Sequence, residues 1–180
     1  MKQRYLAVFL SVLPLVAMAA DAIEGAFGIR LGEPLDVSGL KRIETASHDE
    51  GGEVYAFTPE HPYPPLDEYT VVVGPVSHRV YSIRAVGTVK NRTVCREELA
   101  NLERVLSRKY GRKNPDPAAR MTGASRISFG RGARRITASC AGLVLNYKLQ
   151  LVYYDKAVAA EEKQARPAGK ATRDRDTSGL

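Results

Sequence analysis

The sequence predicts an α+β domain, in which a mainly antiparallel sheet of about six or seven strands carries one amphipathic helix on one face. One stretch repeats apolar residues at helical spacing, and several short stretches have the alternation or the β-branched content of strands. The strand candidates follow one another with short Gly- or Pro-containing turns, which is typical of antiparallel pairing. The expected order of elements is β-β-β-β-α-β-β-β.

The beginning of the chain, residues 1–20, has the pattern of an export signal. Lys2 and Arg4 precede an apolar run, Leu6–Val16, that is short for a membrane-spanning helix. Small residues follow the run, so we expect cleavage near Ala19 or Ala20 and a periplasmic mature protein; an uncleaved anchor is the alternative. No later apolar run approaches the roughly 20 residues of a transmembrane helix, so none is expected in the mature chain.

Four strands are expected before the helix. In Val80–Val89, alternation places Tyr81, Ile83 and Ala85 on one face of the sheet. A Gly-Pro turn precedes this strand, so it should form a hairpin with the β-branched strand before it. The four predicted strands are Ala26–Leu31, Val54–Phe57, Glu68–Val73 and Val80–Val89.

The helix is predicted over Thr93–Gly111. Thr93 is placed to cap its first turn, and Gly111 can adopt the left-handed conformation that ends a helix. An Asn-Pro-Asp-Pro sequence then prevents its continuation. The apolar face of this helix consists of Cys95, Leu99, Leu102, Leu106 and Tyr110.

Three strands are expected after the helix, at Arg126–Phe129, Ala133–Cys140 and Leu143–Tyr154. A Gly-Arg-Gly turn joins the first two, and the third has the clearest apolar–polar alternation in the chain. Ala157–Gln164 can form a helical turn or two. We expect one folded domain over residues 21–160 and a disordered tail over residues 161–180, where apolar anchors are lacking.

The two cysteines, Cys95 and Cys140, are expected to form a disulfide, because an exported protein folds in an oxidising compartment. The bridge would close a loop of about 46 residues, which is worth on the order of 4 kcal/mol in the chain-entropy model. A metal-binding pair and a reactive thiol remain alternatives.

Charge is distributed unevenly along the chain. Residues 21–70 carry 3 basic and 11 acidic side chains, a net of −8, and residues 71–160 carry 17 basic and 5 acidic, a net of +12. A basic surface of this kind favours an acidic protein partner or an envelope polyanion, although a solvated basic face is the simpler interpretation; nucleic acid is not expected for an exported chain. Charge reversal at Arg131 and Arg134 is expected to leave the fold intact. The predicted basic patch consists of Arg104, Arg108, Arg112, Arg126, Arg131, Arg134 and Arg135.

A proline-rich loop, residues 58–67, is the second candidate binding surface. Its four prolines fix φ and remove backbone donors, so the loop should be extended and ordered. His61 and Tyr63 on such a segment suit contact with a partner. The alternative is that the loop crosses the sheet and buries Tyr63 and Leu66.

The sequence lacks the motifs of common catalytic and cofactor sites. It has no Gly-x-Ser-x-Gly, P-loop or dinucleotide fingerprint, and its histidines and carboxylates show no metal-ligand spacing. We therefore expect no catalytic residue, metal or cofactor.

Several stretches resemble small exported bacterial proteins of unassigned activity. These stretches are GAFGIRLGEPLD, the block PYPPLDEYTVVVGPVSHRVYSIRAVG, a helix that ends in RKYG, and LVLNYKLQLVYYD. The resemblance covers most of residues 25–155 and implies a Gram-negative periplasmic setting. Its motifs are structural, so it implies no catalytic residue.

These observations predict a non-catalytic periplasmic module that binds another protein in the cell envelope. One alternative is an inhibitor or immunity protein against a cell-wall hydrolase or an imported toxin. Another is an enzyme whose site is assembled only in the fold.

Overall fold

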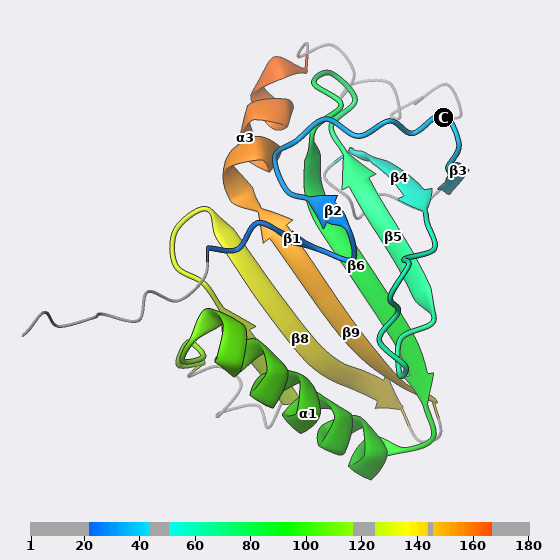
Figure 1. Cartoon of the computed structure of the whole chain (residues 1–180), viewed down its shortest axis with the longest axis vertical. Coiled ribbons are helices and arrows are strands. Elements are labelled where there is room, and N and C mark those ends of the chain that lie inside the picture. The colour runs from blue at the N-terminus through cyan, green and yellow to red at the C-terminus, as the bar shows by residue number, and fades with distance from the viewer. Residues whose placement is uncertain (1–21, 44–50, 117–124, 144–145, 167–180) are drawn as a thin grey trace, which may run out of the picture.

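The computed structural model describes residues 22–43, 51–116, 125–143 and 146–166. Its centre is a seven-stranded, fully antiparallel sheet in the order β3-β4-β5-β6-β9-β8-β7 (Figure 1). The α+β class, the antiparallel sheet and the helix on one face are confirmed. The strands are β3 (Lys41–Ile43), β4 (Glu53–Ala56), β5 (Glu68–Val73), β6 (Val80–Val89), β7 (Ser125–Phe129), β8 (Arg134–Leu143) and β9 (Asn146–Asp155).

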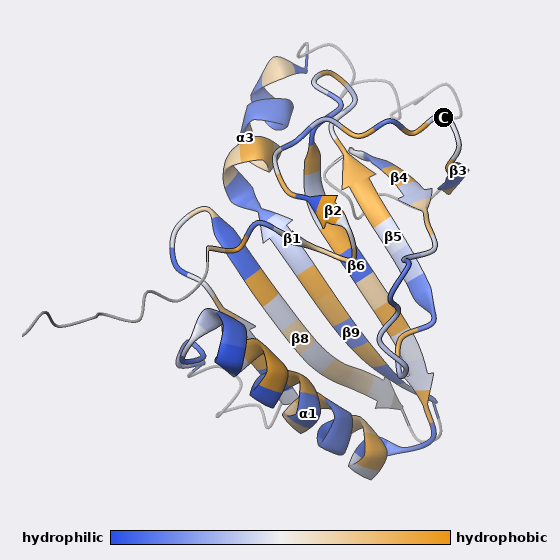
Figure 2. Ribbon diagram, viewed as in Figure 1, coloured by the Kyte–Doolittle hydropathy of each residue, from blue (hydrophilic) through white to orange (hydrophobic). Residues whose placement is uncertain are grey.

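Helix α1 (Arg92–Tyr110) lies across the sheet on what we call the inner face, against β6 to β9. Its cap is Asn91, not the expected Thr93: the Asn91 side chain accepts a hydrogen bond from the Val94 N–H at 2.9 Å. Gly111 ends the helix with φ 78°, as predicted. Figure 2 shows hydrophobic residues alternating with hydrophilic ones around α1, and the buried ones are the five expected, Cys95, Leu99, Leu102, Leu106 and Tyr110.

The first expected strand is wrong in detail. Residues 25–30 form a separate two-stranded hairpin, β1 (Gly25–Ala26) and β2 (Ile29–Arg30). Phe27 and Gly28 both have positive φ, which is the geometry of a tight hairpin turn, so the chain reverses where a continuous strand was expected. This N-terminal segment also covers the inner face, where Ile23 and Leu31 are buried.

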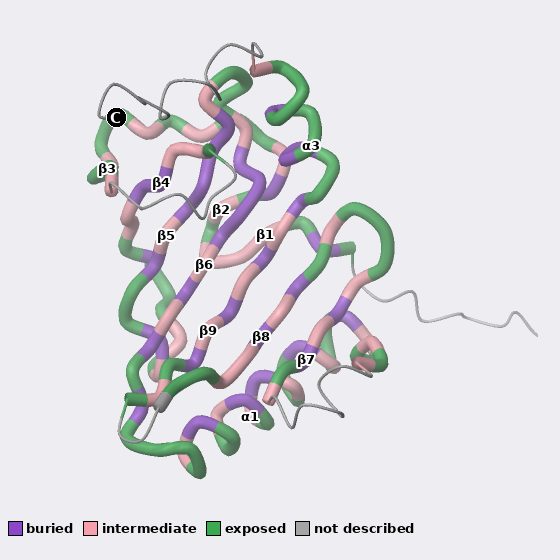
Figure 3. Tube along the Cα trace, turned by 180° about the vertical axis from the view of Figure 1, so that it is seen from behind, coloured by how far each residue is buried: buried purple, intermediate pink, exposed green. Residues whose placement is uncertain are grey.

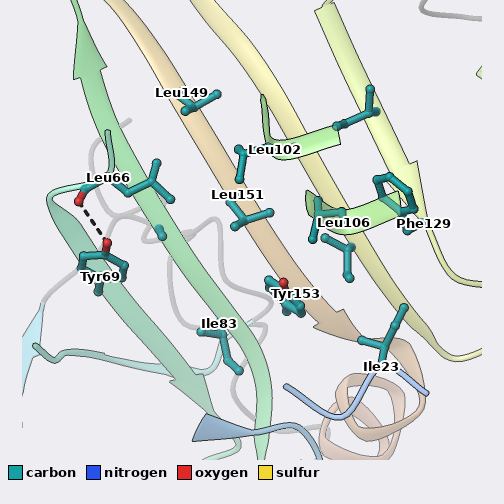
Figure 4. Close-up of a cluster of buried hydrophobic side chains, with 14 of the residues drawn as sticks. Ile23, Leu66, Tyr69, Ile83, Leu102, Leu106, Phe129, Leu149, Leu151 and Tyr153 are labelled. Carbon is teal, nitrogen blue, oxygen red and sulfur yellow. Dashed lines mark hydrogen bonds between the residues drawn. The ribbon is translucent and has the colours of Figure 1, made fainter. Parts of the chain in front are cut away.

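One continuous core joins α1, the N-terminal segment and the inner face of the sheet. Figure 4 shows Leu102 and Leu106 from α1 pointing toward Leu149, Leu151 and Tyr153 on β9. Burial of each such aliphatic side chain contributes about 1.5–3 kcal/mol. Burial raises the pKa of Tyr153 far above its ordinary value, and the neighbouring Tyr110 raises it further.

The single-helix prediction is only partly right, because a second helix, α3 (Lys156–Ala165), packs on the opposite, outer face. A β-bulge in β6 allows this contact. Val73 pairs with Val80 and Val72 with Ser82, so Tyr81 is the extra residue of the bulge. The alternation predicted for Tyr81 therefore fails, and its ring lies in the outer-face cluster with Val158. The expected helical turn thus belongs to a helix that runs to Ala165. The leader, residues 1–20, and the rest of the expected tail, 167–180, lie outside the described residues.

Helix α3 covers only one end of the outer face. Seen from behind in Figure 3, the remaining lengths of β5, β6, β9 and β8 have no other described helix or strand in front of them. Their outward residues are half-buried or exposed, whereas most of the inward ones are buried. No helix among the described residues has the length and apolar content needed to cross a membrane.

Candidate functional site

The disulfide is present between Cys95 and Cys140, whose Cα atoms are 5.9 Å apart. It joins the first turn of α1 to β8, next to the edge strand β7. The bridge therefore fixes α1 against the part of the sheet that carries the later arginines. Both thiols are consumed by this bridge, so the metal-pair and reactive-thiol alternatives are wrong for this structure.

Arg134 differs from the rest of the predicted basic patch, because its guanidinium is engaged inside the fold. Its Nε donates to Asp155 Oδ2 at 2.8 Å. Its two terminal nitrogens donate to the carbonyls of Ile23 and Leu31, at 3.0 and 2.9 Å. Arg134 thus holds the N-terminal segment on the sheet. The expectation that its charge can be reversed without harm to the fold is therefore in conflict with these contacts.

The structure places the other six arginines in three locations. Arg104 and Arg108 are exposed on α1, and Arg104 donates to Asn101. Arg126 and Arg135 lie on the outer face, where Arg126 pairs with Asp116 at 2.7 Å. The remaining two are Arg112 and Arg131, which line one cleft.

This cleft, which we call the arginine cleft, opens between three segments far apart in sequence. They are the end of α1 with the loop after it, the β7–β8 turn, and the N-terminal segment at Ile23. The cleft volume is about 720 Å³. Its principal lining residues are Ile23, Tyr110, Arg112, Asn114, Gly130, Arg131 and Arg134.

Close packing under the β7–β8 turn shapes the arginine cleft. A Cβ on Gly130 would lie 2.4 Å from Ile23 Cδ1 and 2.6 Å from the Arg134 carbonyl oxygen, and Gly130 has a φ of 88°. No other residue type is accommodated there without displacement. Asn114 secures the turn from the other side, since its Nδ2 donates to the Gly130 carbonyl at 2.7 Å and its backbone N–H to that of Ser128.

The lining of the arginine cleft is chemically one-sided. Within the described part of its wall there is no carboxylate, while Arg112 and Arg131 are exposed at its rim. Ile23 and Tyr110 supply buried apolar surface beside them. A guanidinium presents a planar fork that matches a carboxylate and keeps its charge throughout the physiological pH range. The cleft is thus suited to bind an apolar group that carries an anion.

The proline-rich loop is ordered from within by one tyrosine. Tyr69 Oη accepts from the Tyr63 N–H at 2.9 Å and lies 3.0 Å from the Leu66 carbonyl, to which it can donate (Figure 4). Leu66 is buried, as the core-packing alternative predicted, whereas Tyr63 is only half-buried. Burial, together with Glu98 on α1, raises the pKa of Tyr63. His61 points outward, with a side chain that is 91% exposed.

The described residues contain no group of three or more His, Cys, Asp and Glu side chains that could hold a metal ion. His61 and His78 lie in separate loops, and His48 lies outside the described residues. No family model matches the chain, and neither the curated proteins nor the solved structures that were compared with it give a match.

Sequence reasoning identified Arg112, Arg131 and Arg134 but did not bring them together with Ile23. Ile23 precedes the predicted strand Ala26–Leu31, so the expected topology gave it no contact with the β7–β8 turn. The signal that could have found the cleft is the Gly130–Gly132 turn, because a glycine at 130 also permits the close approach of Ile23.

Proposed function

We propose that this protein is an exported, non-catalytic binding module that holds an acidic partner protein through the arginine cleft. The observation that carries the proposal is the combination of Arg112 and Arg131 with the apolar surface of Ile23 and Tyr110 in one cleft. Arginine and tyrosine dominate the energetic centres of protein interfaces, because they pair large buried area with directional hydrogen bonds.

Two properties of the site support contact rather than catalysis. The ionisable side chains among its described lining residues are arginines and one tyrosine, which are poor general acids and bases near neutral pH. The walls are also fixed, because the disulfide and the Arg134 contacts anchor α1 and the N-terminal segment. Fixed walls reduce the ordering cost of association.

The test is a pull-down from periplasmic extract with matched baits. Arg112→Glu/Arg131→Glu reverses the rim charge, and Arg104→Glu/Arg108→Glu makes the same change on the exposed side of α1. We expect the wild type and the α1 variant to retain the same acidic protein and the cleft variant to lose it. Equal retention by all three baits would reject the cleft as the binding site.

A second candidate, an inhibitor of an envelope hydrolase or imported toxin, is favoured by the proline-rich loop. Its backbone is held by Tyr69, while Glu60 and His61 are about nine-tenths exposed at its tip. A loop that is already ordered pays a smaller entropic cost when it enters a concave active site. Under this hypothesis Glu60→Ala/His61→Ala abolishes retention of the partner and Arg112→Glu/Arg131→Glu does not.

A further inference from the structure

The open part of the outer sheet face has a composition unlike that of the arginine cleft. Lateral pairing aligns Thr70, Arg84, Val152 and Thr137 across four strands, and aligns Glu68, Val86, Gln150 and Ser139 in the next row. These rows are about 7 Å apart along the strands, and neighbouring strands are about 5 Å apart. Four of the outward residues in these rows carry a hydroxyl or amide group: Thr70, Thr137, Ser139 and Gln150.

The charges on this face are strongly unbalanced. Three basic side chains project from its strands and a fourth from the edge strand β7, and Glu68 is the one acidic residue that the described strands direct there below α3. Arg135 and Lys148 are exposed, and Arg126 is bound to Asp116 at the edge. The four basic residues are Arg84, Arg126, Arg135 and Lys148.

The hydroxyl and amide side chains between these basic residues argue against a protein as the partner that binds this face. Interface centres are enriched in aromatic residues and methionine and depleted in serine and lysine. Tyr154 lies in the same row as Arg135, and below that row the described outward positions of β5, β6, β9 and β8 include no aromatic side chain. Hydroxyl and amide groups instead both donate and accept hydrogen bonds, as sugar hydroxyls do.

We propose that the open outer face binds an acidic polysaccharide. Its carboxylates would pair with Arg135 and Lys148, and its hydroxyls would bond to Thr137, Ser139 and Gln150. The half-buried Val86 and Val152 offer apolar surface for ring C–H groups. A hollow of about 460 Å³, lined by Glu68 as well as by Val86, Lys148 and Gln150, lies on this face beside the proposed path of the polysaccharide.

The experiment measures the affinity of the mature protein for an oligogalacturonate, a dextran oligomer of the same length and a polyglutamate of the same charge. The oligogalacturonate is expected to bind at least about tenfold more tightly than the polyglutamate, and the dextran to bind negligibly. Arg135→Gln/Lys148→Gln should weaken oligogalacturonate binding about tenfold, whereas Arg104→Gln/Arg108→Gln, with the same loss of charge, should change it less than about twofold. Thr137→Val removes one hydroxyl at constant charge and shape, and should weaken binding severalfold.

Three results would overturn the proposal: absence of oligogalacturonate binding, equal effects of the two charge variants, or equally tight binding of polyglutamate. The last result would point to an acidic protein on this face. Arg112→Gln/Arg131→Gln should leave oligogalacturonate binding unchanged, so this inference and the proposed function fail independently. Unchanged melting temperatures of the exposed-site variants confirm that folding is not the cause.

Discussion

Arg134 and Asp155 form the ion pair on which three parts of the fold converge. Arg134 Nε lies 2.8 Å from Asp155 Oδ2, and the Asp155 side chain is only 5% exposed. The other carboxylate oxygen, Oδ1, accepts from the N–H groups of Ala157 and Val158 and so caps α3. One buried carboxylate therefore links the N-terminal segment, through Arg134, to the start of the C-terminal helix.

Removal of Arg134, which also lines the arginine cleft, should therefore destabilise the protein. Arg134→Gln leaves the buried Asp155 charge unpaired, which is expected to lower the free energy of unfolding by about 3 kcal/mol. The matched control, Arg131→Gln, removes an exposed arginine and should cost less than about 0.5 kcal/mol. Urea unfolding of both variants measures the difference, and equal stabilities would contradict the structural role assigned to Arg134.

Loss of the disulfide should have a larger effect. Cys95→Ser is expected to lower the free energy of unfolding by about 4 kcal/mol, because the unfolded chain regains the entropy of the open loop. Reductant should lower the melting temperature of the wild type to a similar value and leave Cys95→Ser unchanged. A wild-type melting temperature that is insensitive to reductant would show that the bridge does not contribute.

The contacts of Glu162 predict how the free energy of unfolding changes at acidic pH. Its buried carboxylate accepts from the Ser77 N–H at 3.0 Å and the Val76 N–H at 3.2 Å, and so binds α3 to the β5–β6 turn. Burial raises the pKa of Glu162, but these hydrogen bonds and the Arg166 charge outweigh burial, so that its pKa lies below the ordinary value of 4.5.

Because the pKa of Glu162 is lower in the folded than in the unfolded protein, its stabilisation is present above about pH 4.5 and is lost as the pH falls through the folded value. Glu162→Gln should be less stable than the wild type at neutral pH, with the difference narrowing as the pH falls below about 4.5. Chemical unfolding at several pH values tests this. A constant difference across the range would mean that the Glu162 charge is not responsible.

A pair of glycine variants tests the packing under the arginine cleft. Gly130 and Gly132 have similar φ values, 88° and 91°, but only a Cβ at 130 would collide with Ile23. Gly132→Ala should cost about 1 kcal/mol from backbone strain, and Gly130→Ala should cost at least about 1 kcal/mol more. Thermal unfolding measures both losses of stability. Equal losses would show that the close approach of Ile23 to Gly130 does not constrain the fold.

Tyr69→Phe should loosen the proline-rich loop while the core remains intact. The ring still packs against Phe27, 5.0 Å between centroids, but the hydrogen bonds to Tyr63 and Leu66 are lost. The expected cost is about 1–2 kcal/mol, with faster amide exchange confined to residues 58–67. Exchange that is unchanged in this loop would show that its prolines alone hold it.

Local sequence signals predicted the elements better than the contacts between them. The α1 face was predictable because its apolar spacing and Gly111 act within one segment. The cap was misplaced because Asn91 and Thr93 are both acceptable in that role. The Tyr81 bulge could not be predicted, since it depends on the register of β5 and on the approach of α3.

The same limit applies to the candidate site. Seven arginines could be grouped by their positions in the chain, but their roles depend on partners distant in sequence. Arg134 and Arg135 are neighbours that point to opposite faces of the sheet, one to Asp155 and one to solvent. Arg131 and Ile23 meet in the arginine cleft although more than a hundred residues separate them.

Site-specific photo-crosslinking in intact cells tests the central claim most directly. A photoreactive amino acid is placed at Ala133, an exposed residue of the arginine cleft, or at Val76, a residue 54% exposed in the β5–β6 turn and absent from the cleft lining. The account predicts one discrete adduct with an acidic envelope protein from position 133 and none from position 76. The same adduct from both positions, or none from position 133, would contradict it.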